Sequence, residues 1–152
     1  MIFYNTLDVK MPLIPKRKIS KWIKLTAAKF NKRVGEISYI FCSDEKIISI
    51  NKQYLNHNYY TDIITFDYTN KQIISADIFI SVDTVRTNSE KYKTEYINEL
   101  YRVIIHGILH LCELNDKNQE ESKIMEDNEN MALNVLKEIL TEYNTNLYID
   151  NK

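Results

Sequence analysis

The sequence predicts an α+β fold on the basis of three observations. Segments rich in β-branched and aromatic residues fall in the first half of the chain, whereas helical periodicity dominates the second half. Two of the β-rich segments are separated by a short polar turn, which is typical of a β-hairpin. The chain has 152 residues, 44% of them hydrophobic, and its two glycines and two prolines provide no flexible linker. We therefore expect one domain over residues 1–152, with a small mixed sheet covered by helices rather than a doubly wound sheet.

The N-terminal part is expected to contain two strands with a helix between them. Residues 2–7 form the first β-rich segment. In residues 17–33 the apolar side chains recur at helical spacing, and Gly35 is the expected C-cap of this helix. Polar and apolar residues alternate over 36–42, which predicts a strand with one buried face.

A helix, a β-hairpin and three further helices are expected in the rest of the chain. Asp44 is a typical helix-capping residue, and the helix that it begins runs to about Tyr54. The segments 61–68 and 75–81 have high β-propensity, and the polar residues between them can form a hairpin turn. The remaining segments share helical periodicity: 81–93, the strongly apolar 94–112 and the amphipathic 120–143.

Basic residues are concentrated at the N-terminal end. Residues 1–33 contain nine Lys or Arg and one acid, Asp8, whereas residues 113–152 contain four bases and ten acids, although the net charge of the chain is only −1. This asymmetry predicts that the basic end, including the first helix, faces nucleic-acid phosphate while the acidic end stays away from it. A solvated helix face is the alternative explanation for the same charges.

Composition also indicates a compartment. No apolar segment reaches the roughly 18 residues that a membrane-spanning helix needs, and the N-terminus lacks the pattern of a secretory signal. Cys42 and Cys112 are too few for a disulfide scaffold and are consistent with free thiols in a reducing compartment. We therefore expect a cytoplasmic protein with no membrane partner.

The most specific chemical signal is a pair of histidines, His106 and His110, inside the predicted helix 94–112. Residues four apart lie on one face of a helix, so two imidazoles from successive turns can bind one metal ion. Gly107 follows the first histidine, at the position where metalloproteases of the H-E-x-x-H type carry their glutamate base, which argues against a peptidase. Gly107 also costs about 1 kcal/mol in a helix interior, which predicts a close approach of a strand or a substrate there.

The third metal ligand depends on where this helix ends. Asn115 and Asp116 are turn formers, and a chain reversal there would bring the Asp116 carboxylate back toward the ion. If the helix continued instead, Asp116 would lie about 80° from His106 around the axis, and Glu113 would lie about 20° from it. Glu113 is therefore an alternative ligand, and His57 is a more remote one.

Two arginines are candidates for binding a phosphate. Arg102 lies one turn before His106 on the same side of the predicted helix, where its guanidinium can meet a phosphate group. Arg86 is the second candidate. An ordinary salt bridge is the alternative explanation for each.

Three segments, in order, resemble the YbeY-type endoribonucleases of ribosomal RNA maturation. Residues 106–116 read HGILHLCELND, which is similar to the family hallmark H-G-x-L-H-L-x-G-Y-D-H. Residues 50–66 read INKQYLNHNYYTDIITF and look like L-N-x-x-Y-R-x-x-D-x-x-T-D-V-L-S-F. Residues 76–86 read ADIFISVDTVR and look like G-D-I-x-I-S-x-D-T-A-R. With the helix that follows, the resemblance covers about residues 46–135.

The sequence departs from the family pattern at three positions. Asp116 stands where the family has its third histidine, and aspartate is also a competent zinc ligand. Glu113 stands where the family has glycine, so we expect Asn115 to take the left-handed turn position, in which a bulkier residue is strained. Leu55 replaces an arginine that the family is expected to use for phosphate.

The resemblance implies a zincin-like metallohydrolase fold in which His106, His110 and Asp116 bind one metal ion, for which we expect zinc, and Arg102 or Arg86 steadies the phosphate. Two histidines and a carboxylate also suit Fe(II), so the sequence leaves the identity of the metal open. A zinc ion with an open coordination position lowers the pKa of bound water toward about 7, which suits phosphodiester hydrolysis. The implied activity is cleavage of single-stranded ribosomal RNA, including 16S rRNA 3′-end processing. The implied partners are the small ribosomal subunit and assembly factors, in ribosome assembly or quality control. A non-enzymatic RNA-binding assembly factor with a structural metal is the alternative.

Overall fold

A four-stranded sheet organises the chain in the computed structural model, which describes residues 1–56 and 61–150, with side chains to residue 142. The elements of the described residues, in chain order, are β1 (Ile2–Thr6), α1 (Lys16–Lys29), β2 (Arg33–Cys42), α2 (Asp44–Leu55), β3 (Ile63–Asp67), β4 (Ile73–Ser81), α3 (Val82–Lys91), α4 (Tyr96–Leu111) and α5 (Gln119–Asp150). Among these, no helix combines the length and apolar character needed to cross a membrane.

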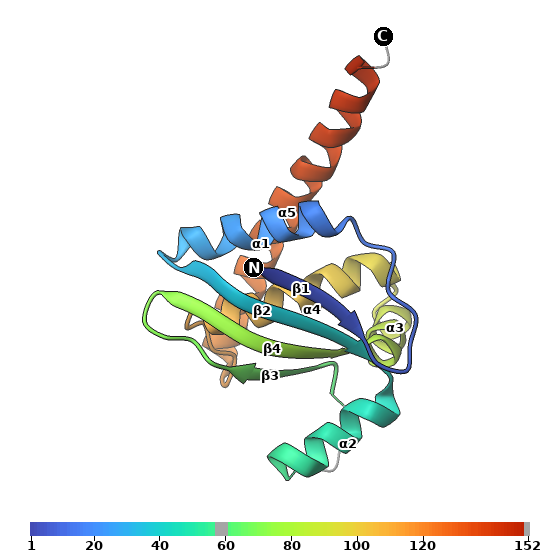
Figure 1. Cartoon of the computed structure of the whole chain (residues 1–152), viewed down its shortest axis with the longest axis vertical. Helices are drawn as coiled ribbons and strands as arrows, with labels where there is room; N and C mark the ends of the chain where they lie inside the picture. Colours follow the sequence, from blue (N-terminus) through green and yellow to red (C-terminus); the bar gives the residue numbers. More distant parts are fainter. Residues whose placement is uncertain (57–60, 151–152) are drawn as a thin grey trace.

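The sheet is mixed, with strand order β1-β2-β4-β3 (Figure 1). Strands β1, β2 and β4 are parallel, and Phe41 of β2 is in register with Thr6 of β1 and Ile80 of β4. Strand β3 is antiparallel to β4, so these two strands form the expected hairpin. The predicted α+β fold with a small mixed sheet is therefore confirmed, and β1 and β3 are the two edges of the sheet.

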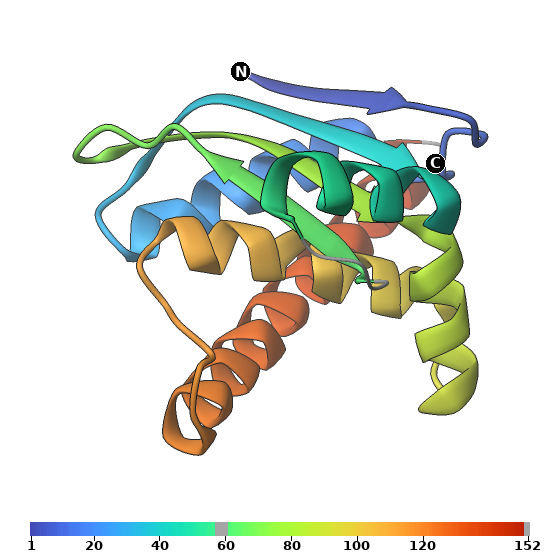
Figure 2. The ribbon, with the colours of Figure 1, turned by 90° about the horizontal axis from the view of Figure 1, so that it is seen from below.

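Helices cover both faces of the sheet. The main core packs the sheet against α1, α4 and α5 (Figure 2). Trp22, Tyr39 and Ile104 are fully buried in this core. Successive strand residues point to opposite faces, so Phe79 leaves this core and joins a smaller cluster with Ile47 of α2. The indole N–H of Trp22 donates to the carbonyl of Ala132 at 2.7 Å, which connects α1 to α5 inside the core.

Helix α1 ends four residues earlier than expected, and Gly35 is not its cap. Asn31 has a left-handed φ of 59°, and the N–H of Lys32 donates to the carbonyl of Ala27 at 3.0 Å, in the pattern of a Schellman motif. Strand β2 therefore begins at Arg33 and includes Gly35, next to an irregularity in its register with β4. A Cβ at Gly35 would lie 2.5 Å from Ser75 Oγ, so the close approach of β4 explains this glycine.

The cap of α2 also differs from the expectation. The Ser43 side chain, not that of Asp44, accepts the N–H of Lys46 at 3.2 Å and caps the helix. The Asp44 carboxylate instead accepts a hydrogen bond from Ser81 Oγ at 2.6 Å. Ser81 in turn caps α3 through the N–H of Thr84, so the starts of α2 and α3 are connected at the end of β4.

Candidate metal centre

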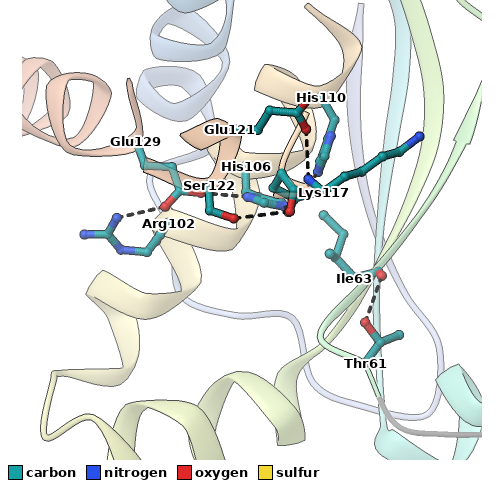
Figure 3. A network of polar contacts seen from close by, with 10 residues as sticks. Thr61, Ile63, Arg102, His106, His110, Lys117, Glu121, Ser122 and Glu129 are labelled. Atoms are coloured by element: carbon teal, nitrogen blue, oxygen red, sulfur yellow. Dashed lines mark hydrogen bonds and ion pairs between the residues drawn. The ribbon is translucent and has the colours of Figure 1, made fainter. Parts of the chain in front are cut away.

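Helix α4 presents His106 and His110 on one side, near the β3 edge of the sheet (Figure 3). The helix forms because its apolar residues bury one stripe against the sheet. At Gly107 the helix approaches the sheet closely, and a Cβ there would lie 3.1 Å from Ile63 Cδ1 and 3.4 Å from Ile78 Cδ1. A strand contact thus accounts for this glycine, and it places the histidine pair beside β3.

The end of α4 turns the chain back toward the histidines. Glu113 has a left-handed φ of 76° and donates its N–H to the carbonyl of His110 at 3.0 Å, while the N–H of Leu114 donates to Leu109 at 3.1 Å. This is again a Schellman motif, and it ends the helix as the third-ligand hypothesis requires. The expectation that Asn115 takes the left-handed position was wrong, because these two hydrogen bonds select the residue after the C-cap.

Side-chain and backbone hydrogen bonds hold the loop that carries Asp116. The hydroxyl of Ser122 donates to the Asp116 carbonyl at 3.2 Å. The Glu121 carboxylate accepts the N–H of Lys117 at 3.0 Å (Figure 3). The Asn118 side chain accepts the N–H of Glu121 at 2.8 Å. The start of α5 therefore anchors the loop, which limits where the Asp116 carboxylate can lie.

Three potential ligand atoms converge as a result. Asp116 Oδ2 lies 3.5 Å from Nε2 of both His106 and His110, and the three donors lie within 4.8 Å of one another. Tetrahedral zinc ligands at bond lengths of about 2.0–2.1 Å are separated by about 3.4 Å, so the two separations of 3.5 Å and the donor types fit a zinc ion. The three side chains are 21%, 33% and 42% exposed, so solvent can reach this cluster.

The alternative third ligands do not join the cluster in the described structure. The Glu113 carboxylate lies 3.6 Å from Lys32 Nζ, and Glu113 is absent from the group of converging donors. His57 lies outside the described residues. Asp116 is therefore the carboxylate that the fold brings to the histidine pair.

Glu129 of α5 contacts the site and was missed by the sequence reasoning. Its Oε2 lies 2.6 Å from His106 Nδ1, so an Nδ1–H donates to this carboxylate and leaves the Nε2 lone pair for a metal ion. Glu129 is only 8% exposed. A signal was present in the sequence, because Met125, Ala132 and Leu136 are buried at helical spacing and Glu129 interrupts the same stripe.

The two candidate arginines have different surroundings. Arg102 donates to Glu129 Oε1 at 2.9 Å and to Asn130 Oδ1 at 2.8 Å, and it lines a cleft of about 460 Å³ that also reaches Asp116. The guanidinium carbon of Arg86 lies 4.2 Å from the centre of the Tyr96 ring and lines a separate hollow. The structure brings Arg102 to the site and does not bring Arg86 there.

Carboxylates control the electrostatics of the site. Burial by itself would lower the pKa of His106, but the hydrogen bond and charge of Glu129, together with the charges of Asp116 and Asp62, raise that pKa above its ordinary value of 6.5. Burial raises the pKa of Asp62 itself, and His106 partly opposes this effect. Asp62, just before β3, is thus a third acidic group near the site, beside Asp116 and Glu129.

Known proteins resemble the chain over nearly all of its length. A family model described as Endoribonuclease YbeY matches residues 6–137. Proteins named Endoribonuclease YbeY include one from Parabacteroides distasonis, 59% identical over 90% of this chain and 96% of the relative, and one from Bacteroides thetaiotaomicron, 60% identical over 87% and 96%. A Porphyromonas gingivalis protein of the same name is 47% identical over 87% of each chain.

A solved structure supports the fold. The solution structure of TM1509 from Thermotoga maritima matches with a TM-score of 0.65 and covers 96% of this chain and 93% of that one. Its sequence identity of 24% carries the likeness of fold alone. The family model and the relatives at 47–60% identity decide the assignment, and the chain belongs to the YbeY endoribonuclease family.

Proposed function

We propose that this protein is a metal-dependent endoribonuclease that cleaves single-stranded ribosomal RNA. The observation that carries the proposal is the convergence of Nε2 of His106, Nε2 of His110 and Oδ2 of Asp116, with both histidine nitrogens 3.5 Å from the carboxylate oxygen. Membership of an endoribonuclease family supports RNA as the substrate. These three residues would hold a zinc ion, which would supply Lewis-acid activation of water and of a phosphoryl oxygen.

The surrounding side chains orient the ligands and the substrate. Glu129 accepts the Nδ1–H of His106 and keeps Nε2 directed at the ligand cluster. The guanidinium of Arg102 has five N–H donors, so its bonds to Glu129 and Asn130 leave donors to steady a phosphate in the cleft. Arg86 remains a prediction from the sequence and has no role in this mechanism, because its guanidinium packs over Tyr96.

The biological setting is part of this proposal. We propose that the substrate is ribosomal RNA, including the 3′ end of 16S rRNA, and that the enzyme acts in ribosome assembly or quality control in the cytoplasm. Its partners are then the small ribosomal subunit and assembly factors. The match to an endoribonuclease family supports the RNA-processing part of this setting.

Cleavage of a labelled single-stranded RNA carrying the 16S 3′ region tests the proposal. We expect cleavage by the purified protein, loss of cleavage on chelation, recovery on addition of zinc, and no cleavage by His106→Ala, because one of three ligands is then missing. If the protein binds the RNA but gives no more product than His106→Ala, the non-enzymatic assembly factor is the correct reading. The first variant to test would then be Leu55→Arg, which restores the arginine of the family pattern at this position.

A further inference from the structure

A basic groove lies between α1 and the edge strand β1. It has a volume of about 620 Å³, and its charged lining consists of Lys16, Arg17, Lys21 and Lys24. Strand β1 is at one edge of the sheet and β3 is at the other (Figure 1). The turn of α4 that carries the histidine pair packs against β3, so the basic groove is separate from the candidate metal centre.

The charges of the basic groove are available to a ligand. All four cations are exposed, and within the described residues none of them is in an ion pair. Among the side chains that the structure describes, no acidic one lines the groove, and the first turn of α1 contains none either. The positive end of the helix dipole therefore adds to the field of the four side chains.

The groove offers little to distinguish one base from another. Tyr4 and Ser20 lie among its lining residues, but their hydroxyl groups are hydrogen-bonded to each other at 2.9 Å. One face of the Tyr4 ring stacks on Tyr39, with 5.7 Å between ring centres. The available groups are thus the cations, which contact phosphates and carry no sequence information.

The cleft beside the candidate metal centre is acidic, so a basic surface elsewhere on the molecule would help the protein to bind RNA. This cleft is lined by four carboxylates, those of Glu99, Asp116, Glu126 and Glu129, with Arg102 as its one cation among the described residues. These carboxylates weaken the attraction of the cleft for an RNA strand, and cations elsewhere on the surface can supply the attraction that is lost. The basic groove is suited to that role because it concentrates positive charge at the far edge of the sheet.

We propose that the basic groove binds the phosphodiester backbone of single-stranded RNA, remote from the bond that is cleaved. This inference rests on the proposed function, because RNA is then the polyanion that both surfaces hold. The groove contributes affinity that depends on charge and not on base sequence. It leaves the chemistry at His106, His110 and Asp116 unchanged.

The test compares two double variants that each remove two exposed helix cations. Lys21→Ala/Lys24→Ala changes the groove, whereas Lys46→Ala/Lys137→Ala changes α2 and α5, and alanine favours the helix in both. Binding of labelled single-stranded RNA is measured by fluorescence anisotropy at several salt concentrations, in the His106→Ala background so that no RNA is cut. We expect the groove variant to bind on the order of tenfold more weakly, with a salt slope lower by about 1.4, or about 0.7 per lost phosphate contact.

Further measurements separate this inference from the proposed catalysis. With His106 intact, the groove variant should have a higher KM for RNA and an unchanged kcat. Its affinities for poly-U and poly-A should fall by the same factor. If no variant cleaves RNA but the groove variant alone loses binding, the groove assignment stands and the catalytic proposal fails. Equal affinity and salt slope in the two double variants would overturn the groove assignment. The groove assignment would also be overturned if the groove variant lost binding of polyglutamate and kept its binding of RNA, because the groove would then bind an acidic polypeptide.

Discussion

Hydrogen bonds of Arg102 and His106 to the Glu129 carboxylate connect α4 to α5 at the candidate metal centre. Arg102 donates to one oxygen of the Glu129 carboxylate, and His106 donates to the other. A buried carboxylate is unfavourable when it is alone, so the two partners together account for the position of Glu129 in the buried stripe of α5. The same arrangement orients the His106 ring, since a histidine with one nitrogen held by a carboxylate presents the other to the ion.

Glu129→Gln should weaken zinc binding by roughly 10–100-fold, because it removes the charge that holds the His106 ring and polarises it. Competition with a chromophoric chelator measures this affinity without any activity assay. Glu138→Gln is the matched control, since Glu138 is exposed on the same helix. Equal affinities in the two variants would mean that His106 is oriented without Glu129.

Asp116→Ala should strongly reduce zinc affinity, and Asp116→His should restore much of it, because imidazole is also a zinc ligand and the hallmark that residues 106–116 resemble has histidine at this position. Glu113→Gln should have little effect, since its carboxylate lies near Lys32. Metal content after dialysis at low free zinc measures all three. Loss of the metal in Glu113→Gln, with retention in Asp116→Ala, would assign the third ligand to Glu113.

The ends of the helices matter as much as their interiors for this fold. Both α1 and α4 end in Schellman motifs, with Asn31 and Glu113 at the left-handed position. Asparagine tolerates this conformation, whereas a glutamate there is strained by about 1–2 kcal/mol. The strain at Glu113 is present at the turn that delivers Asp116, so it is a local cost of forming the ligand cluster.

Glu113→Gly should raise the free energy of unfolding by about 0.5–1 kcal/mol, because the relief of strain exceeds the added chain entropy of a glycine in the unfolded state. The lost contact with Lys32 changes little, since the Glu113 side chain is 81% exposed and the Lys32 ammonium, on a side chain only 9% exposed, keeps its hydrogen bond to the Lys71 carbonyl at 3.3 Å. Asn31→Gly is the comparison and should gain less. Urea unfolding measures both, and a destabilised Glu113→Gly would show that the left-handed turn is not strained.

At the scale of the whole molecule, the core and the candidate metal centre are separate. The fully buried side chains of the core, Trp22, Tyr39 and Ile104 among them, belong to the layer between the sheet and the helices, whereas the three ligands are partly exposed. The three candidate ligands therefore lie outside the hydrophobic core. This separation is expected of a catalytic metal and not of a structural one.

Chelation should abolish RNA cleavage and leave the fold in place, because the core does not include the ligand cluster. Far-UV and near-UV circular dichroism before and after chelation, beside an RNA cleavage assay, measures the two effects. Loss of near-UV signal together with activity would indicate a structural metal and contradict this separation.

The metal-free protein should lose stability as the pH rises through the pKa of His106. That pKa is raised in the folded state, so the protonated histidine stabilises the fold fully below the unfolded value of 6.5 and loses this contribution above its folded value. Zinc binding has the opposite dependence, since a proton on Nε2 excludes the metal. Urea unfolding across this pH range in the presence of chelator measures the effect. A decline of equal size in His106→Ala would assign it to another group.

The sequence by itself determined the order of helices and strands, the hairpin and the histidine pair. These features depend on residues close together in the chain: the alternation in residues 36–42, the helical stripe of residues 94–112 and the spacing of His106 and His110. The sequence also showed that Asp116 departs from the family pattern. It predicted that the site keeps a third ligand, because an aspartate carboxylate can bind zinc. Such local patterns survive in the fold since they report which face of each element is apolar.

Only the tertiary structure decided where the helices end and which side chains support the ligands. Asn31 and Glu113, rather than Gly35 and Asn115, take the left-handed positions, because the hydrogen bonds that close each helix compete with the strand or loop that follows. Glu129 meets His106 across 23 residues of chain, and that contact exists only because α5 packs beside α4. The local sequence therefore specified one helix face of the site, and packing between α4 and α5 completed the rest.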